Sequence, residues 1–292
     1  MEGISRRISI NFDLKLGKFD VFLQKNTSMN RQVSAQIIER KYLAKDFQLS
    51  TWESVLTYFE QLSQTEITTL ADFLQFCENR SELESYLSEN FAWRYIKMSC
   101  DNQNEAHQLS YQQFVNEIMP NASVYDDAWN KKVTESPYIS ELPETGYAVM
   151  LRGMKKSIEI FREENIPLFT DLQNLQTQYG AATGSLMVEI DGEEKTLQQA
   201  NAFLESTDRA KRQAVYEKVS NARLAIQENL DLLFNQLVEK RNEVAINAGF
   251  ANYRDYAFAS LGRFDYSPAD CFEFHEAVAN TVVPIINQQA EK

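Results

Sequence analysis

The chain has 292 residues, of which 43% are hydrophobic, and 42 Asp and Glu against 29 Lys and Arg give it a formal net charge of −13. This length and composition suffice for a substantial core in one large or two medium domains, which argues against a disordered chain. The acidic balance argues against nucleic-acid binding, because contact with phosphates needs a concentrated basic face and no run of Lys or Arg exceeds two residues.

The cysteines and the apolar runs indicate where such a chain resides. Cys77, Cys100 and Cys271 lie far apart and are odd in number, which favours reduced thiols over a disulfide framework. Residues 1–25 carry charged residues throughout and lack the apolar segment of a secretory signal. No apolar run reaches the roughly eighteen residues that a membrane span needs. We therefore expect a soluble, cytoplasmic protein without a membrane partner.

The first half of the chain predicts helices with short connections. Residues 1–25 alternate apolar and polar side chains in places, which predicts a short strand or an extended arm. Capping-box patterns at residues 50–53, 63–66 and 81–84 then predict the starts of three helices, the first ending near Leu62, in an antiparallel bundle. A fourth helix is expected over residues 105–118, stopped by Pro120, and a fifth over 122–134. Residues 136–146 read as a loop.

The middle of the chain contains the clearest strand pattern. Helical spacing resumes at Tyr147 and continues to about Ala182, with a new helix expected near Pro167 because proline cannot continue the preceding turn. Residues 184–197 then alternate apolar and polar side chains on either side of Asp191-Gly192, a pair that suits a tight turn. A β-hairpin over about residues 184–197 is predicted, packed against the helices because an isolated hairpin is marginally stable.

Two further helices are expected in the last third. Apolar residues recur at three- and four-residue steps from Val215 to Ala248, which predicts one helix about forty residues long with Gly249 as its C-cap. Ser267 and Pro268 predict the start of a last helix, which Pro284 is expected to interrupt. We place the domain boundary near residues 197–206, with an N-terminal helical region over 1–200 and a second domain over 201–292.

Candidate catalytic patterns are incomplete. A helix with the pattern His-Glu-x-x-His can hold zinc between two imidazoles, but His275-Glu276 is followed by Ala279 where the second histidine is needed. His107, the other histidine, has no ligand-type pattern around it. No glycine-rich phosphate loop or serine nucleophile motif is present in the sequence. We therefore assign no catalytic residue and no metal ligand to this chain.

One charged and aromatic segment stands out as a candidate binding surface. Its candidate residues are Tyr253, Arg254, Asp255, Tyr256, Arg263, Asp265 and Tyr266. Such guanidinium, carboxylate and phenol groups can bind peptide backbones and termini, or they can form internal ion pairs that dock one helical layer on another. The sequence leaves both alternatives open.

Residues 249–278, GFANYRDYAFASLGRFDYSPADCFEFHEAV, resemble the segment that precedes the catalytic helix in oligoendopeptidase F-like zinc metallopeptidases of the M3 family. Residues 89–105, 161–169, 187–200 and 233–250 resemble upstream segments of the same family, in the same order. The resemblance covers the chain from about residue 35 onward. It implies a mainly helical, cytoplasmic enzyme that uses one zinc ion to cleave short peptides in a deep channel between two lobes.

The resemblance also implies that the catalytic centre lies outside this chain. The His-Glu-x-x-His helix and the later glutamate of these peptidases belong to a part beyond Lys292, so none of their functional residues is carried over. The fold expected is a mainly α, multi-helix array with one β-hairpin, part of a two-lobed zincin-type oligopeptidase. The chain is expected to supply scaffold and channel wall, to bind no zinc itself, and to self-associate through surface meant for the other half. The alternative is a non-catalytic helical module that binds peptides or proteins.

Overall fold

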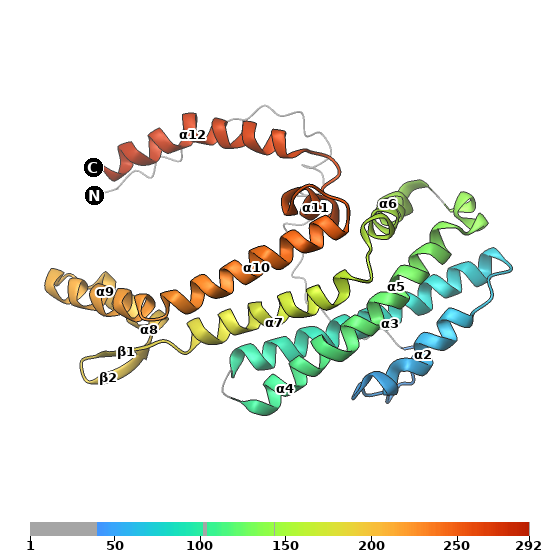
Figure 1. Ribbon diagram of the computed structural model, residues 1–292, viewed down its shortest axis with the longest axis horizontal. Coiled ribbons are helices and arrows are strands. Elements are labelled where there is room, and N and C mark those ends of the chain that lie inside the picture. The colour runs from blue at the N-terminus through green and yellow to red at the C-terminus, as the bar shows by residue number, and fades with distance from the viewer. Residues whose placement is uncertain (1–39, 102–103, 143, 292) are drawn as a thin grey trace, which may run out of the picture. The chain divides into compact units, whose positions relative to one another are not determined.

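The computed structural model describes residues 40–101, 104–142 and 144–291 (Figure 1). The described residues belong to one compact unit, Arg40–Lys292. The strand or arm expected within residues 1–25 lies outside the described residues.

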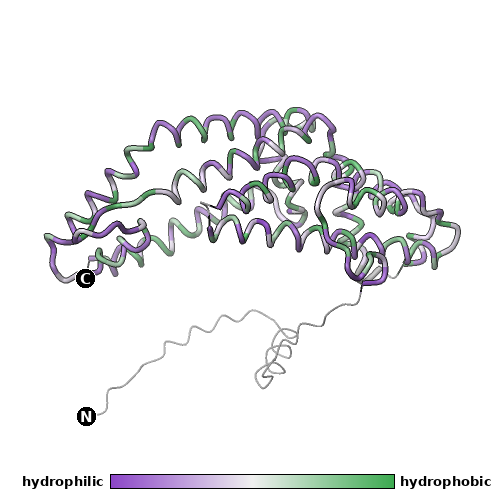
Figure 2. Tube along the Cα trace, turned by 90° about the horizontal axis from the view of Figure 1, so that it is seen from below, coloured by the Kyte–Doolittle hydropathy of each residue, from purple (hydrophilic) through white to green (hydrophobic). Residues whose placement is uncertain are grey.

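The described part of the chain is mainly helical with one antiparallel hairpin, as the sequence predicts. Apolar and polar residues are interspersed along the helical segments (Figure 2). The first elements are α2 (Trp52–Gln64), α3 (Leu70–Cys100), α4 (Glu105–Gln113), the π-helical turn η1 (Phe114–Ile118), α5 (Met119–Thr134) and the 3-10 turn η2 (Pro137–Glu141). They are followed by α6 (Glu144–Ile160), α7 (Asn165–Gly184), β1 (Met187–Ile190), β2 (Glu193–Thr196), α8 (Leu197–Asn201) and η3 (Ala202–Glu205). The last are α9 (Arg209–Leu224), α10 (Gln227–Asn247), α11 (Tyr253–Ser260) and α12 (Pro268–Ala290).

The largest apolar core joins α2, α3, η1 and α5. Its fully buried members include Val55, Phe59, Leu62, Phe73, Phe76, Leu83, Ile118, Trp129 and Val133. Trp129 stacks on Phe59 with ring centres 5.1 Å apart, and its indole Nε1 donates to the hydroxyl of Ser63 at 2.9 Å. The core therefore buries its largest side chain without leaving the indole donor unpaired.

Two predicted helix starts are wrong: residues 81–84 lie inside a helix, and residues 63–66 span the end of α2 and the connection after it. The predicted starts at residues 63–66 and 81–84 are replaced by one helix, α3, whose N-cap is Thr69. The Thr69 hydroxyl accepts from the amide of Asp72 at 3.1 Å, and the Asp72 carboxylate accepts from the amide of Thr69 at 2.9 Å. The first box is shifted by one residue, with Thr51 as N-cap of α2. No glycine or proline lies between residues 70 and 100, so nothing there stops α3.

Pro120 does not stop the chain's helical course, contrary to expectation. Proline has no amide to donate to the carbonyl of residue 116, and the helix accommodates it through the π-turn η1 immediately before. In that turn the amide of Met119 reaches back five residues to the carbonyl of Phe114. The Glu117 carboxylate also accepts from the amide of Trp52 at 2.7 Å, which places a negative charge at the start of α2. The expected loop over residues 136–146 contains η2 and the first residues of α6.

The predicted hairpin is confirmed. β1 pairs antiparallel with β2, with Ile190 opposite Glu193. Asp191 and Gly192 both have positive φ, 55° and 82°, as a type I′ turn requires. Val188 and Ile190 are buried in a separate apolar cluster with Ala200 of α8 and with Val215 and Val219 of α9. The hairpin therefore rests on helices, as expected.

The predicted forty-residue helix is two helices. α9 ends at Leu224 and α10 begins at Gln227, although the apolar stripe continues across the break. The two halves of the stripe pack on different cores, because α9 contacts β1 whereas α10 lies against α7. The predicted C-cap is confirmed: Gly249 has φ 86°, and the amide of Phe250 bonds the carbonyl of Ala245 at 2.9 Å.

The start of α12 is confirmed and its predicted interruption is wrong. Ser267 is the N-cap, and the Asp270 carboxylate accepts from its amide at 2.7 Å. The helix continues through Pro284 to Ala290. Residues 279–290 are exposed, so the carbonyl that Pro284 leaves without a donor can bond water.

Glu82 attaches the first described residues to α3. Its carboxylate accepts from three consecutive amides, those of Lys41 at 2.9 Å, Tyr42 at 3.1 Å and Leu43 at 2.8 Å. Burial acts to raise the pKa of Glu82, but these amides and the nearby Arg40 outweigh it and the pKa is lowered.

We predict that Glu82→Ala lowers the free energy of unfolding by about 2 kcal/mol at pH 7, because three amides lose a charged acceptor. Since the folded pKa is below the ordinary value of 4.5, this stabilisation is present at neutral pH and is lost as the pH falls through the folded pKa. Urea unfolding of wild type and variant between pH 7 and pH 3 measures it. Glu78→Ala, an exposed glutamate of the same helix, is the control. An equal loss in the two variants would contradict the role given to Glu82.

Candidate functional site

The candidate segment is held by the packing of α10 on α7. The second apolar cluster lies between them and includes Ile160, Leu168, Leu172, Val244, Ala245, Ala248 and Tyr256. Asn165 at the start of α7 is 1% exposed, and its side-chain amide donates to the carbonyl of Val244 at 3.0 Å. Its side-chain oxygen accepts from Asn247 at 2.9 Å. These bonds fix the C-terminal end of α10. A short connection then leads to α11.

Asp255 and Arg254 form the first turn of α11. Asn252 is the N-cap, and its side-chain oxygen accepts from the amide of Asp255 at 3.1 Å. The Asp255 carboxylate accepts from Arg254 Nε and from the Asn252 side-chain amide, both at 2.9 Å. The bonds from Arg254 and Asn252 lower the pKa of Asp255, in that order of effect. The Asp255 carboxylate is therefore occupied by Arg254 and by the side chain of the N-cap Asn252.

The two tyrosines of α11 differ in their surroundings. Tyr256 is 6% exposed within the second cluster, with Phe250 edge-on at 5.7 Å between ring centres. Burial, with a contribution from Tyr253, raises the pKa of Tyr256 to about 12. Tyr253 is exposed, and the guanidinium of Arg241 lies 5.8 Å from its ring centre. Tyr256 is part of the core, and Tyr253 is available to a partner.

The second half of the segment reverses the chain and contacts α6. Gly262 has φ 63°, and the guanidinium of Arg263 lies over the ring of Phe258 at 5.0 Å. Asp265 pairs with Arg152 of α6 at 3.3 Å, an exposed pair that adds little stability. Tyr266, 48% exposed, meets Phe258 edge-on at 5.9 Å.

The seven candidate residues therefore have two kinds of role. Tyr256 and Asp255 have structural partners within the chain, and Asp265 links the segment to α6. Tyr253, Arg254, Arg263 and Tyr266 present exposed aromatic and cationic groups. Contact of these residues with a substrate channel or a second lobe stays a prediction.

Sequence reasoning predicted exposed surface meant for the other half but did not locate it on α12. In the described part of the chain none of its residues is buried, although α12 is rich in apolar side chains. The exposed ones are Phe272 (55%), Phe274 (67%), Val282 (44%), Val283 (43%), Ile285 (57%) and Ile286 (56%). On α10, Leu232, Phe234, Val238 and Ile246 are also exposed. The signal was present in the sequence, because a helix that is apolar on several faces is one that becomes covered.

Among the described residues, no group of three His, Cys, Asp or Glu side chains is arranged to hold a metal ion. His275 is exposed on α12, with its ring 6.3 Å from that of Phe272. Nor does any helix in the described ranges have the length and hydrophobicity of a membrane span.

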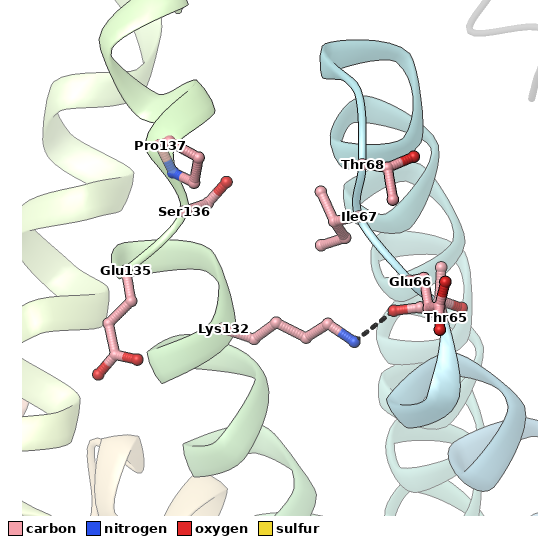
Figure 3. Close-up of a pocket in the computed structure, with 8 residues that line it drawn as sticks. All are labelled: Thr65, Glu66, Ile67, Thr68, Lys132, Glu135, Ser136 and Pro137. Carbon is pink, nitrogen blue, oxygen red and sulfur yellow. Dashed lines mark hydrogen bonds between the residues drawn. The ribbon is translucent and has the colours of Figure 1, made fainter.

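A surface hollow between the connection from α2 to α3 and the C-terminal end of α5 contains a lysine with a structural role (Figure 3). The Lys132 ammonium donates to the carbonyl of Thr65 at 2.6 Å and to that of Ser63 at 2.9 Å, at the C-terminal end of α2. Burial lowers the pKa of Lys132. Because the ammonium is already committed to these carbonyls, it is not a candidate catalytic group.

We predict that Tyr256→Ala lowers the free energy of unfolding by about 3–4 kcal/mol, because it empties a buried aromatic site. Tyr266→Ala, at an exposed position ten residues away, should change it by about 0.5 kcal/mol or less. Urea unfolding followed by circular dichroism measures both. Similar losses in the two variants would show that Tyr266 also belongs to the core.

Comparisons with known proteins agree with this fold. Residues 45–161 match the family model for the peptidase M3 N-terminal domain, and residues 202–292 match that for peptidase family M3. Comparison with curated proteins gives no match.

Similar solved structures include a protein assigned as oligoendopeptidase F (21% identity, TM-score 0.79, covering 87% of this chain and 45% of that one). Another is assigned as oligoendopeptidase F from Bacillus anthracis str. Ames (21% identity, TM-score 0.77, covering 86% and 46%). A third is PZ peptidase A with an inhibitor (22% identity, TM-score 0.75, covering 85% and 43%). The chain thus spans less than half the length of these three proteins, and at these identities the likeness shows the fold alone. The two family matches together cover more than half of the chain, which belongs to the M3 peptidase family.

Proposed function

We propose that this chain is the N-terminal scaffold of a cytoplasmic, zinc-dependent oligoendopeptidase that hydrolyses short peptides. It forms part of the substrate channel wall, and the zinc and its ligands belong to the other half of the enzyme. Support comes from the two M3 matches, which occur in the order N-terminal domain and then peptidase family. The division near residue 200 into an N-terminal region and the start of the catalytic domain is part of the same proposal.

The observation that carries the proposal is the uncovered apolar surface of α12. This helix lies in the segment that matches the peptidase family, yet Phe274 is 67% exposed and Ile285 57% exposed. Apolar surface of this kind marks an interface. A second lobe that packs on α12 would cover it, and the exposed residues Tyr253, Arg263 and Tyr266 would then lie near that contact or near the peptide.

The alternative is a non-catalytic helical module that binds peptides or proteins through the same exposed groups. A coding sequence that continues past Lys292 to a His-Glu-x-x-His motif would exclude it. A natural stop codon directly after Lys292 would favour it over the peptidase scaffold.

We predict that the purified 292-residue chain has no peptidase activity, because its sequence lacks the second histidine of the zinc motif. The assay is hydrolysis of a quenched fluorescent short peptide with added zinc, with an intact M3 peptidase as positive control. The expected rate is that of buffer. Turnover that a chelator abolishes would overturn the assignment of the catalytic centre to the other half.

We also predict that the chain self-associates through α12. Sedimentation velocity should show a weight-average mass that rises with concentration, and the double variant Phe274→Lys/Ile285→Lys should remain monomeric. The matched control is Leu109→Lys on α4, a comparably exposed leucine outside α12, which should associate like wild type. A compact wild-type monomer at high concentration would contradict the role given to α12.

A further inference from the structure

A second hollow lies within the helical region, between α3, α5 and α6. Its volume is about 460 Å³, within the range of roughly 300–1,000 Å³ that is usual for small-molecule sites. One wall, from α3 and α5, carries charged side chains. The facing wall, from α6 and the residue just after it, is largely apolar. The proposed peptidase function makes no use of this hollow.

Arg80 on the charged wall has unused hydrogen-bonding capacity. It is 7% exposed, its Nε donates to Glu84 at 2.5 Å, and its Nη2 donates to Asn130 at 2.8 Å. Its Nη1 is buried and has no partner among the described residues. A buried guanidinium donor without an acceptor is costly, so an acceptor supplied by a ligand would be favoured.

Asp127, on the same wall, has an unused acceptor. It is 8% exposed, and one carboxylate oxygen accepts from Lys131 at 2.6 Å. Its other oxygen, Oδ1, is buried and unpaired within the described ranges. The neighbouring Asp126 also lines the hollow. Burial, with a contribution from Glu84 and against the effect of Arg80, raises the pKa of Asp126 to about 6. This wall therefore offers acceptors for a cation beside a donor for an anion.

The wall from α6 is suited to an apolar group. Met150, Met154 and Phe161 line it as half-buried side chains. Gly153 lies among them, and a Cβ built there would meet no atom within 4 Å. This side of the hollow therefore has room for an apolar side chain.

We propose that the hollow binds a free α-amino acid with an apolar side chain. The carboxylate accepts from Arg80, the ammonium donates to Asp127 and Asp126, and the side chain lies against Met150, Met154 and Phe161. The carboxylate and the ammonium of the ligand each meet a group of opposite charge, and its side chain meets apolar groups. A simple anion or cation would make only one of these contacts. The unpaired atoms of Arg80 and Asp127 are buried, so the proposal includes a rotation of these two side chains that brings the atoms to the ligand.

Isothermal titration calorimetry of the full chain with L-leucine at pH 7 tests the chemistry. We expect saturable binding with Kd on the order of 1 mM. L-Leucinamide lacks the carboxylate and N-acetyl-L-leucine lacks the ammonium, so each should bind about tenfold more weakly. No saturable binding of leucine, or equal binding of the three compounds, would overturn the proposal.

Two glycine variants test the location. Gly153→Leu places a side chain inside the hollow and should abolish leucine binding. Gly180→Leu on α7 is the matched control, because it is also a helical glycine with no atom within 4 Å of a built Cβ and does not line the hollow. Both substitutions favour helix, so both variants should fold, which thermal unfolding verifies. Undiminished binding in Gly153→Leu, or equal loss in both variants, would place the site elsewhere and overturn the proposal.

Discussion

The buried side chain of Asn165 is the interaction on which the C-terminal half of the described structure depends. It donates to a carbonyl of α10 and accepts from Asn247 while it is itself part of α7. Because a buried amide must keep its partners, these bonds admit one position of α10 along α7. The surrounding apolar residues contribute most of the packing energy, but apolar contacts are not directional and do not fix the position of α10 in this way. Through Tyr256 the same contact sets the position of α11, and hence the point from which α12 starts.

Features fixed by local chemistry could be predicted from the sequence. Gly249 and Asp191-Gly192 require backbone angles that few residues adopt, and Ser267 caps a helix that proline begins. Patterns compatible with more than one conformation gave wrong results. A serine followed three residues later by a glutamate can begin a helix or lie inside one, as residues 81–84 do in α3. The break between α9 and α10 could not be predicted for a related reason. The apolar stripe continues from one helix to the other, although the two helices pack on different cores.

The candidate site shows the same division. The family could be inferred from the sequence, but the separate surroundings of Tyr253 and Tyr256 could not. They are three residues apart on one helix, and only the position of α10 decides that Tyr256 is 6% exposed. The unpaired atoms of Arg80 and Asp127 could not be anticipated either. They arise where α3, α5 and α6 meet, and the sequence places those residues almost fifty positions apart.

The π-turn at Phe114–Ile118 accommodates one residue without changing which faces of the flanking helices are buried. A π-turn holds one residue more than the α-helical turn it replaces, whereas each residue of a regular α-helix turns the chain by about 100°. Tyr111 before the turn and Trp129 after it are both buried, so the widened turn keeps both on core faces. A deletion of one residue within the turn would shorten it to an α-helical turn and leave Trp129 near Phe59. A deletion between the turn and Trp129 would instead rotate Trp129 away from Phe59 by about 100°.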